Sequence, residues 1–287
     1  MTDTRAAGRL PAAPTTNLAL PSRGSAFAAV GVLAALNAQA DQILVDLTWQ
    51  SPIGALLNLG GISAVMWTAM LVAWKIGGEA DRPLRGWLDQ AVLAVVAFLS
   101  FVPISYAAQA GLLICACYLL ITAGRDGDAE RRSAIVLLAL TGPLIWGRLL
   151  LRLFEKSILS LDAHLVASAI GSRVDGNVVR FADGSGRMVI GDPCSSVHNI
   201  SLAIVLWTTA AMLFSIRIDR QYVTVGIAMA ASMFALNVVR LSALGLFPAH
   251  FEFLHHGEGA IMFGWAGLIT AALLAGLGVV RADARQR

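Results

Sequence analysis

Residues 191–214 have the sequence GDPCSSVHNISLAIVLWTTAAMLF. The first part combines a glycine and a proline with a cysteine, a histidine and two serines, whereas the second part is apolar apart from hydroxyl groups. A helix needs about 20 mostly apolar residues to cross the hydrocarbon core of a bilayer. The stretch therefore predicts a transmembrane helix that begins among polar, chemically reactive side chains.

The whole chain has the composition of an integral membrane protein. Of its 287 residues, 57% are hydrophobic and 14% are charged, and the mean hydropathy is +0.72. Soluble domains carry about 25% charged residues. The formal net charge is +3, which we attribute to loop residues. We therefore expect a lipid bilayer around the chain and no nucleic acid partner.

Eight apolar segments, of which the third and fourth are the shortest, predict an all-α protein with about eight transmembrane helices. They lie at residues 26–47, 54–74, 89–104, 107–123, 133–153, 197–214, 222–245 and 258–280. The third and fourth segments are separated by Pro103 and Ser105. They are either two helices or one long kinked helix.

Loop charges predict the orientation of these helices. With the N-terminus in the cytoplasm, 14 of the 21 basic residues lie on the cytoplasmic side, where the Lys and Arg of short loops are enriched. We therefore expect both termini in the cytoplasm, with a flexible tail at 1–24, one polytopic domain at 25–281 and a tail at 282–287. No small-residue cleavage site follows the first apolar segment, so we expect it to remain as a helix.

The one long loop, at about 154–196, is expected on the extracytoplasmic side. It contains VVRFADGSGRMVIG at residues 178–191, in which two β-prone runs flank DGSG and predict a β-hairpin before the sixth span. The preceding EKSILSLDAHLVASAIG, residues 155–171, predicts an amphipathic helix at the membrane interface.

This topology brings polar groups from distant parts of the sequence to one face of the membrane. Cys194 precedes the sixth span, Asn237 and Arg240 lie near the outer end of the seventh, and His255 and His256 precede the eighth. Hydropathy and loop charge alone therefore predict a site at the extracytoplasmic face.

Cys194 has two interpretations. Cys115 and Cys117 lie inside the fourth span, where a free cysteine acts as a small hydrophobic residue, so Cys194 has no disulfide partner on the outer side. It is either a tolerated, buried thiol or a nucleophile. A helix N-terminus carries partial positive charge and favours an anion, which supports the nucleophile, and Pro193 helps to fix the chain entering the helix.

Arg240 either extends to the membrane interface or binds an anion such as a thiolate, an oxyanion or a carboxylate. Asn237, three residues earlier on the same helical face, could orient it or donate to an oxyanion. Histidine is the usual general base for a cysteine nucleophile.

Adjacent residues on a helix point about 100° apart, so only one of His255 and His256 is expected to face the cysteine. Glu258 or Glu252 would orient it. The alternative is that both histidines are interfacial residues at a helix cap.

A further set of polar residues consists of Ser195, Ser196, Asn199, Arg148, Arg152, His198 and Asp41. The serines and the asparagine either donate to an oxyanion or cap the helix. The two arginines either reach the interface or hold an acidic substrate segment, and the aspartate could pair with one of them. The histidine is an alternative base, because it shares a helical face with the cysteine.

At these residues the sequence resembles the exosortase/archaeosortase family. The motifs that carry the resemblance are Cys194 before an outer helix, Asn237-Val-Val-Arg240, and His255 followed by Gly259 and Phe263 at the start of the last helix. This spacing favours His255 over His256. The family's cysteine is often followed by Ser-Gly, whereas Ser195-Ser196 follows it here. The resemblance covers roughly residues 50–280 in the pattern of spans.

The resemblance implies a membrane cysteine protease or transpeptidase of the bacterial inner membrane, with its active site outside. Its substrates would be secreted, membrane-anchored proteins with a PEP-CTERM-type C-terminal sorting signal, made of a short motif, a transmembrane helix and a basic tail. Cys194 would form a thioacyl intermediate, and Arg240 would stabilise the thiolate or the oxyanion. His255 would protonate the leaving amine and then activate an acceptor: water, an amine or a glycan component. No metal and no organic cofactor are implied.

Other classes of protein compete with this interpretation. A transporter or channel would line a polar path with Asp41, Arg148 and Arg240, although the sequence shows no related halves. A zinc protease would carry an H-E-x-x-H motif, which HHGEG does not supply. An assembly scaffold would tolerate the loss of Cys194.

Overall fold

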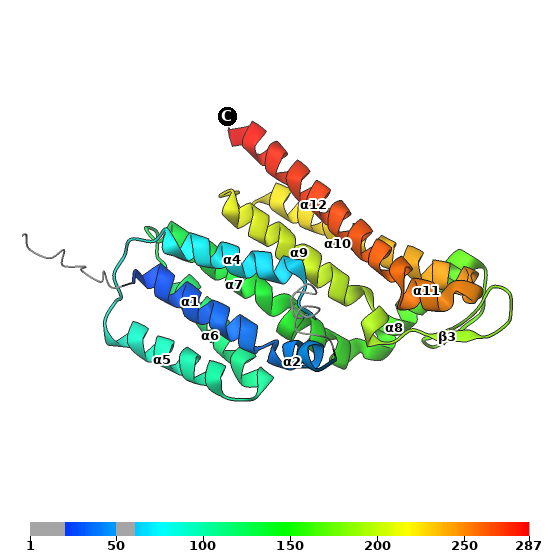
Figure 1. The fold of residues 1–287 in the computed structure, drawn as a ribbon. Helices are drawn as coiled ribbons and strands as arrows, with labels where there is room; N and C mark the ends of the chain where they lie inside the picture. Colours follow the sequence, from blue (N-terminus) through cyan, green and yellow to red (C-terminus); the bar gives the residue numbers. More distant parts are fainter. Residues whose placement is uncertain (1–20, 50–60, 287) are drawn as a thin grey trace, which may run out of the picture.

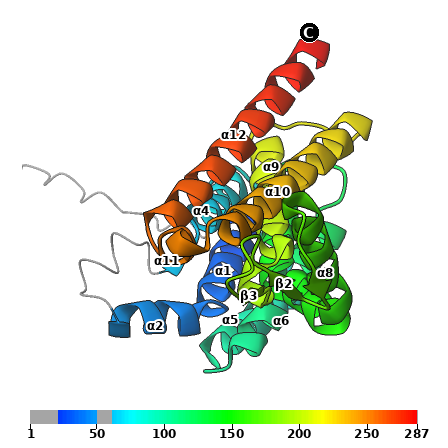
Figure 2. The same cartoon turned by 90° about the vertical axis from the view of Figure 1, so that its right-hand side faces the viewer.

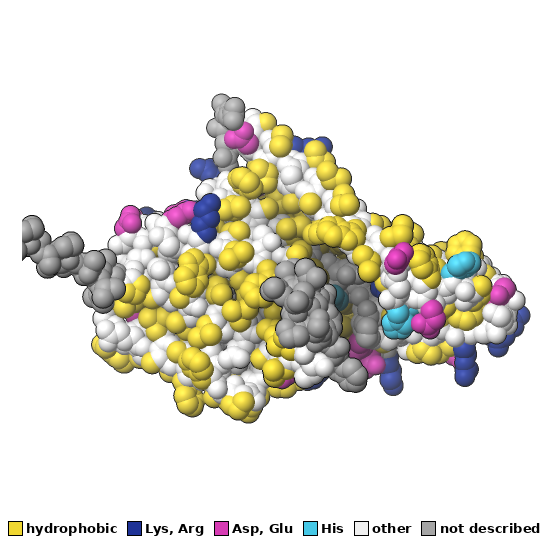
Figure 3. All heavy atoms as spheres, in the orientation of Figure 1, with side chains coloured by type: hydrophobic (Ala, Val, Ile, Leu, Met, Phe, Trp, Pro, Cys, Tyr) yellow, Lys and Arg dark blue, Asp and Glu magenta, His cyan; other side chains and the backbone are white. Residues whose placement is uncertain are grey.

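The computed structural model describes residues 21–49 and 61–286, which form a helical bundle with a small three-stranded sheet (Figure 1). The long helices run in broadly similar directions, and the sheet lies at one end of them, which we call the sheet end. Figure 3 shows charged side chains gathered towards the two ends and apolar side chains over the surface between them. This arrangement confirms the predicted all-α membrane class.

The helices are α1 (Arg23–Asn37), α2 (Ala40–Trp49), α4 (Ala64–Gly78), α5 (Trp87–Phe101), α6 (Ser105–Thr122), α7 (Asp128–Thr141), α8 (Gly147–Ile170), α9 (Ser196–Leu213), α10 (Arg220–Leu246), α11 (Phe251–His255) and α12 (Glu258–Gln286). By length and composition, five helical segments of the described chain can cross a membrane. Three more apolar helices, α1, α4 and α5, have 15 residues each. A membrane protein is therefore confirmed, whereas the predicted count of eight spans is not.

The first predicted span, 26–47, is divided in the structure. Helix α1 ends at Asn37, and α2 continues at a large angle to it (Figure 2). Gln39 donates from its side chain to the Ala35 carbonyl, and polar residues follow it, so the segment loses its apolar character here. The start of the second predicted span, 54–74, lies outside the described residues. The third and fourth predicted spans are two separate helices, α5 and α6.

Helix α8 extends far beyond the predicted fifth span. The helical chain continues from α7 through a π-helical turn, η2 (Gly142–Trp146), into α8. Pro143 lacks the N–H of a regular helix and lies in this turn. The predicted interfacial helix at 155–171 is thus the second half of α8, bent at Phe154. The irregular part of the loop predicted at 154–196 begins only at Gly171, which has a φ of 66°.

The sheet contains the predicted hairpin. Strands β2 (Val178–Arg180) and β3 (Arg187–Val189) pair antiparallel around the DGSG turn. A two-residue strand, β1 (Val174–Asp175), pairs with β2 and was not predicted.

The sheet packs on α8 and α10 through a small apolar core. The fully buried residues of this sheet-end core are Leu159, Ala163, Val166, Ala167, Val179, Met188, Ile190, Leu241 and Leu244. Cys194, Phe251 and Leu254 pack against its edge. The core therefore joins α8, the sheet, α10 and α11 at the place where Cys194 lies.

The opposite end is held by a buried ion network. The guanidinium of Arg23, which has no exposed surface, donates to Asp89 at 2.8 Å and to Glu130 at 2.6 Å. Arg82 also pairs with Glu130, and Tyr118 donates to Asp89 at 2.8 Å. The sequence placed Arg23 in the N-terminal tail, whereas it begins α1 and ties this helix to α5 and α7.

We expect Glu130→Gln to destabilise the fold by about 3 kcal/mol, because removal of one partner leaves buried guanidinium charge uncompensated. The measurement is the free energy of unfolding in detergent micelles. The matched control is Asp128→Asn, since Asp128 is 66% exposed in its pairs with Arg131 and Arg132, and its loss should cost less than about 1 kcal/mol. Equal effects of the two variants would contradict a stabilising role for the network.

Candidate active site

Cys194 lies in a 3-10 turn, η3 (Asp192–Cys194), two residues before α9. Its N–H donates to the Gly191 carbonyl at 2.9 Å. Ser195 is the N-cap of α9, and its hydroxyl accepts from Val197 N–H at 3.3 Å. The cysteine therefore precedes α9 and is not part of it. Cys194 and His198 do not share a face of this helix, contrary to the prediction from the sequence.

A buried carboxylate anchors the first residue of α9. Both the N–H and the hydroxyl of Ser196 donate to Asp162 on α8, at 3.3 and 3.2 Å. Asp162 is 1% exposed. Asp162 was not among the predicted site residues, because serines and a histidine surround it in the sequence and its buried partner, Ser196, is distant along the chain.

Helix α10 contributes Asn237 to the site. Its side-chain amide donates to the carbonyl of Cys194 at 2.9 Å. Asn237 is 3% exposed, and its Oδ1 has no hydrogen-bond partner within the described residues. The Nε of Arg240, one turn later, is buried and also lacks a partner there. Within the described chain, α10 thus carries one unpaired acceptor, on the residue that bonds to Cys194, and one unpaired donor a turn later.

His255 faces the cysteine at the end of α11. Its Nε2 lies 3.7 Å from the Sγ of Cys194, and its Nδ1 lies 2.7 Å from the Nε2 of His256. The ring stacks on Phe251 with centroids 5.1 Å apart and planes 13° apart. In the tautomer with the proton on Nδ1, the Nδ1–H donates to His256 and the lone pair of Nε2 faces the thiol.

The surroundings of His255 lower its pKa. Partial burial disfavours the charged ring, and the positive fields of His256 and Arg240 add to the effect, while Glu252 opposes it. The imidazole is therefore neutral at neutral pH. A neutral imidazole with its lone pair towards a thiol can accept the thiol proton.

The expected orienting group of His255 is revised. His256, not Glu258 or Glu252, contacts the Nδ1 of His255. The two rings meet edge to face, with centroids 4.1 Å apart. The contact was missed because α11 ends at His255, so the 100° rotation of a continuing helix does not apply.

Arg148, His198 and Arg152 have other surroundings. Arg148 and His198 line a second cavity of about 360 Å³ together with Gln39 and Gln42. Arg152 donates to the hydroxyl of Tyr106 at 2.8 Å.

Among the contacts of the described residues, Asp41 pairs with neither Arg148 nor Arg152, so the predicted pairing is wrong. The carboxylate of Asp41 instead accepts a hydrogen bond from Ser105. Asp41 therefore belongs to the contact between α2 and the start of α6.

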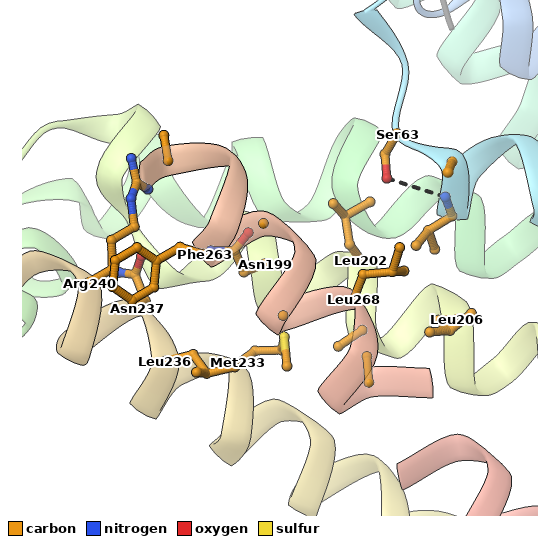
Figure 4. Close-up of a pocket in the computed structure, with 17 residues that line it drawn as sticks. Ser63, Asn199, Leu202, Leu206, Met233, Leu236, Asn237, Arg240, Phe263 and Leu268 are labelled. Atoms are coloured by element: carbon orange, nitrogen blue, oxygen red, sulfur yellow. Dashed lines mark hydrogen bonds between the residues drawn. The ribbon is translucent and has the colours of Figure 1, made fainter. Parts of the chain in front are cut away.

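A cavity of about 370 Å³ opens beside the site, between α4, α9, α10 and α12. Figure 4 shows Asn237, Arg240 and Phe263 together at one end of it, with Asn199 close by. Apolar residues and glycines line the remainder, together with Ser63 at the start of α4. No group of three or more His, Cys, Asp or Glu residues in the described chain could hold a metal ion.

These features define a polytopic membrane protein with a thiol–imidazole pair at one end of its helices. Residues 53–272 match the family model of the transmembrane exosortases. The match covers most of the chain, so the protein belongs to the exosortase family. No curated protein and no solved structure matches the chain.

We expect the imidazole of His255 to titrate below its ordinary pKa of 6.5. The measurement is NMR of protein with isotope-labelled histidine in lipid nanodiscs. His256→Ala removes one positive neighbour, so the midpoint should move up towards 6.5. His164→Ala, on α8, is the matched control and should leave the midpoint unchanged. A wild-type midpoint at or above 6.5 would contradict the described environment.

Proposed function

We propose that this protein is a membrane cysteine endopeptidase or transpeptidase that cleaves C-terminal sorting signals of PEP-CTERM type at the extracytoplasmic face. The observation that carries the proposal is the 3.7 Å contact of Cys194 Sγ with His255 Nε2 in a chain of the exosortase family. Members of this family are generally membrane cysteine peptidases or transpeptidases. Sequence motifs and geometry thus point to the same two residues.

The proposed reaction passes through a thioacyl enzyme. The Sγ proton moves to His255 Nε2, and the thiolate attacks the scissile carbonyl carbon to give a tetrahedral oxyanion. The C–N bond breaks as His255 returns the proton to the leaving amine. An acceptor, which is water, an amine or a glycan hydroxyl, then loses its proton to His255, attacks the thioester and releases the thiolate.

Arg240 and Asn237 support different parts of this reaction. Arg240 has a free donor beside the site and would stabilise the thiolate or the oxyanion. Its positive charge also helps to keep His255 neutral and hence able to act as a base. Asn237 would act as a positioning residue, because it holds the carbonyl of the nucleophile itself.

The proposed location is the bacterial inner membrane with both termini in the cytoplasm. The distribution of 14 of the 21 basic residues supports this orientation. The sheet end would then face outward and meet the short motif of a secreted, membrane-anchored substrate. The apolar surface between the two ends (Figure 3) is suited to the lipid bilayer.

We expect Cys194→Ala to abolish cleavage of a secreted reporter that ends in a sorting signal, because the thioacyl step loses its nucleophile. The measurement is the size of the reporter on a gel, with the amount of membrane-inserted enzyme as a control. Cys117→Ala should cleave normally. Normal cleavage by Cys194→Ala would exclude the mechanism and would leave the second cavity, with Arg148 and His198, as the basis for a transporter.

Arg240→Lys should lower kcat/KM by about 10²–10³-fold, the usual effect of losing an oxyanion donor. The substitution keeps the charge but removes the planar donor group. Lysine retains the positive charge near His255, so the acid limb of the pH profile, which reports protonation of His255, should stay at the same pH. Only the rate should fall. A variant with nearly wild-type turnover would remove Arg240 from the mechanism.

A further inference from the structure

The cavity beside the site is a groove that follows α12. Its lining on this helix runs from Ala260 to Ala271, a length of about 16 Å at 1.5 Å per residue. The other walls come from the start of α4, from α9 and from α10. The groove therefore leads from the residues beside Cys194 into the apolar part of the bundle.

Four of the six α12 residues that line the groove are small, and the other two are Phe263 and Leu268. Ala260, Gly264, Gly267 and Ala271 recur at helical spacing and all line the cavity. Gly264 is exposed, and a Cβ placed on it would have no atom within 4 Å. Small residues at this spacing allow two helix backbones to approach closely within a membrane.

The end of the groove near the site offers unpaired polar atoms. Asn237 is 3% exposed, lines the groove, and leaves its Oδ1 without a partner among the described residues. The first turn of any α-helix has free N–H groups that need such an acceptor. The acyl chain of a lipid has no donor or acceptor that could bond to the side chains of Asn237 and Arg240. The start of a peptide helix has both N–H and carbonyl groups.

We propose that this groove binds the transmembrane helix of the substrate, with the N-terminal end of that helix at Asn237. The inference rests on the proposed function, because it assigns a docking surface to the same substrate. It places the residues that precede the substrate helix next to Cys194 and Arg240. The small residues of α12 do not discriminate between apolar side chains of the substrate. The groove would therefore recognise a helix and not a particular sequence motif.

The test compares Gly264→Leu with Gly276→Leu. Both glycines lie on α12 in open space, but only Gly264 lines the groove. Gly264→Leu should fill it and lower kcat/KM for the reporter by about tenfold or more. Alkylation of Cys194 by a small thiol reagent should remain at the wild-type rate. Gly276→Leu should cleave normally, and equal activity of the two variants would overturn the proposal.

A cross-linking experiment tests the groove independently of cleavage. In a Cys194→Ala, Cys117→Ala background, Leu268→Cys in the groove should form a disulfide with a cysteine in the reporter helix. Leu277→Cys, which replaces a side chain that is 54% exposed outside the groove, should not.

The two experiments separate two kinds of failure. If the wild type does not cleave but the disulfide forms, the proposed function fails and the groove still binds a helix. The inference is overturned by a different pattern, in which the wild type cleaves but Leu268→Cys forms no disulfide. If phospholipid is then retained by the wild type and lost from Gly264→Leu, the groove holds lipid.

Discussion

The candidate site depends on the sheet-end core, in which α8, α10 and the hairpin bury their apolar side chains against one another. Val179 of β2 has no exposed surface, and Leu241 of α10 is 1% exposed in the same cluster. Cys194, Phe251 and Leu254 pack at its edge. Burial of apolar surface is non-directional, so it brings these segments together but does not orient them. Orientation comes from the bonds of Asn237 to Cys194 and of Ser196 to Asp162.

The site places a positive charge next to a base, which serves two purposes. Arg240 contributes to the lowered pKa of His255, and a base with a lowered pKa is unprotonated over a wider pH range. The same charge would favour an anionic sulfur or oxygen nearby. The Nδ1 of His255 contacts His256, in the place where a carboxylate or an amide often orients a catalytic histidine. With the proton on Nδ1, Nε2 would be able to take the proton of Cys194.

The parts of this structure that local sequence determines were predictable. Apolar length predicted the helices, the DGSG turn predicted the β2–β3 hairpin, and unusual polar residues in apolar surroundings pointed to Cys194, Asn237, Arg240 and His255. The features that depend on packing between distant segments were not. Arg23 was placed in a flexible tail because its partners, Asp89 and Glu130, are far away in sequence. The helical continuity from α7 through the Pro143 turn into α8 was likewise not predicted.

Buried polar groups of the described chain are paired to different degrees, and Gln221 at the start of α10 also leaves a side-chain atom without a partner. At the end opposite the sheet, Arg23, Asp89 and Glu130 satisfy one another in a closed network. At the sheet end, the Oδ1 of Asn237 and the Nε of Arg240 are buried without partners in the described chain. Each such group costs about 1–3 kcal/mol relative to a bonded one. Under the proposed function, the Oδ1 of Asn237 and the Nε of Arg240 would be binding groups whose partner arrives with the substrate.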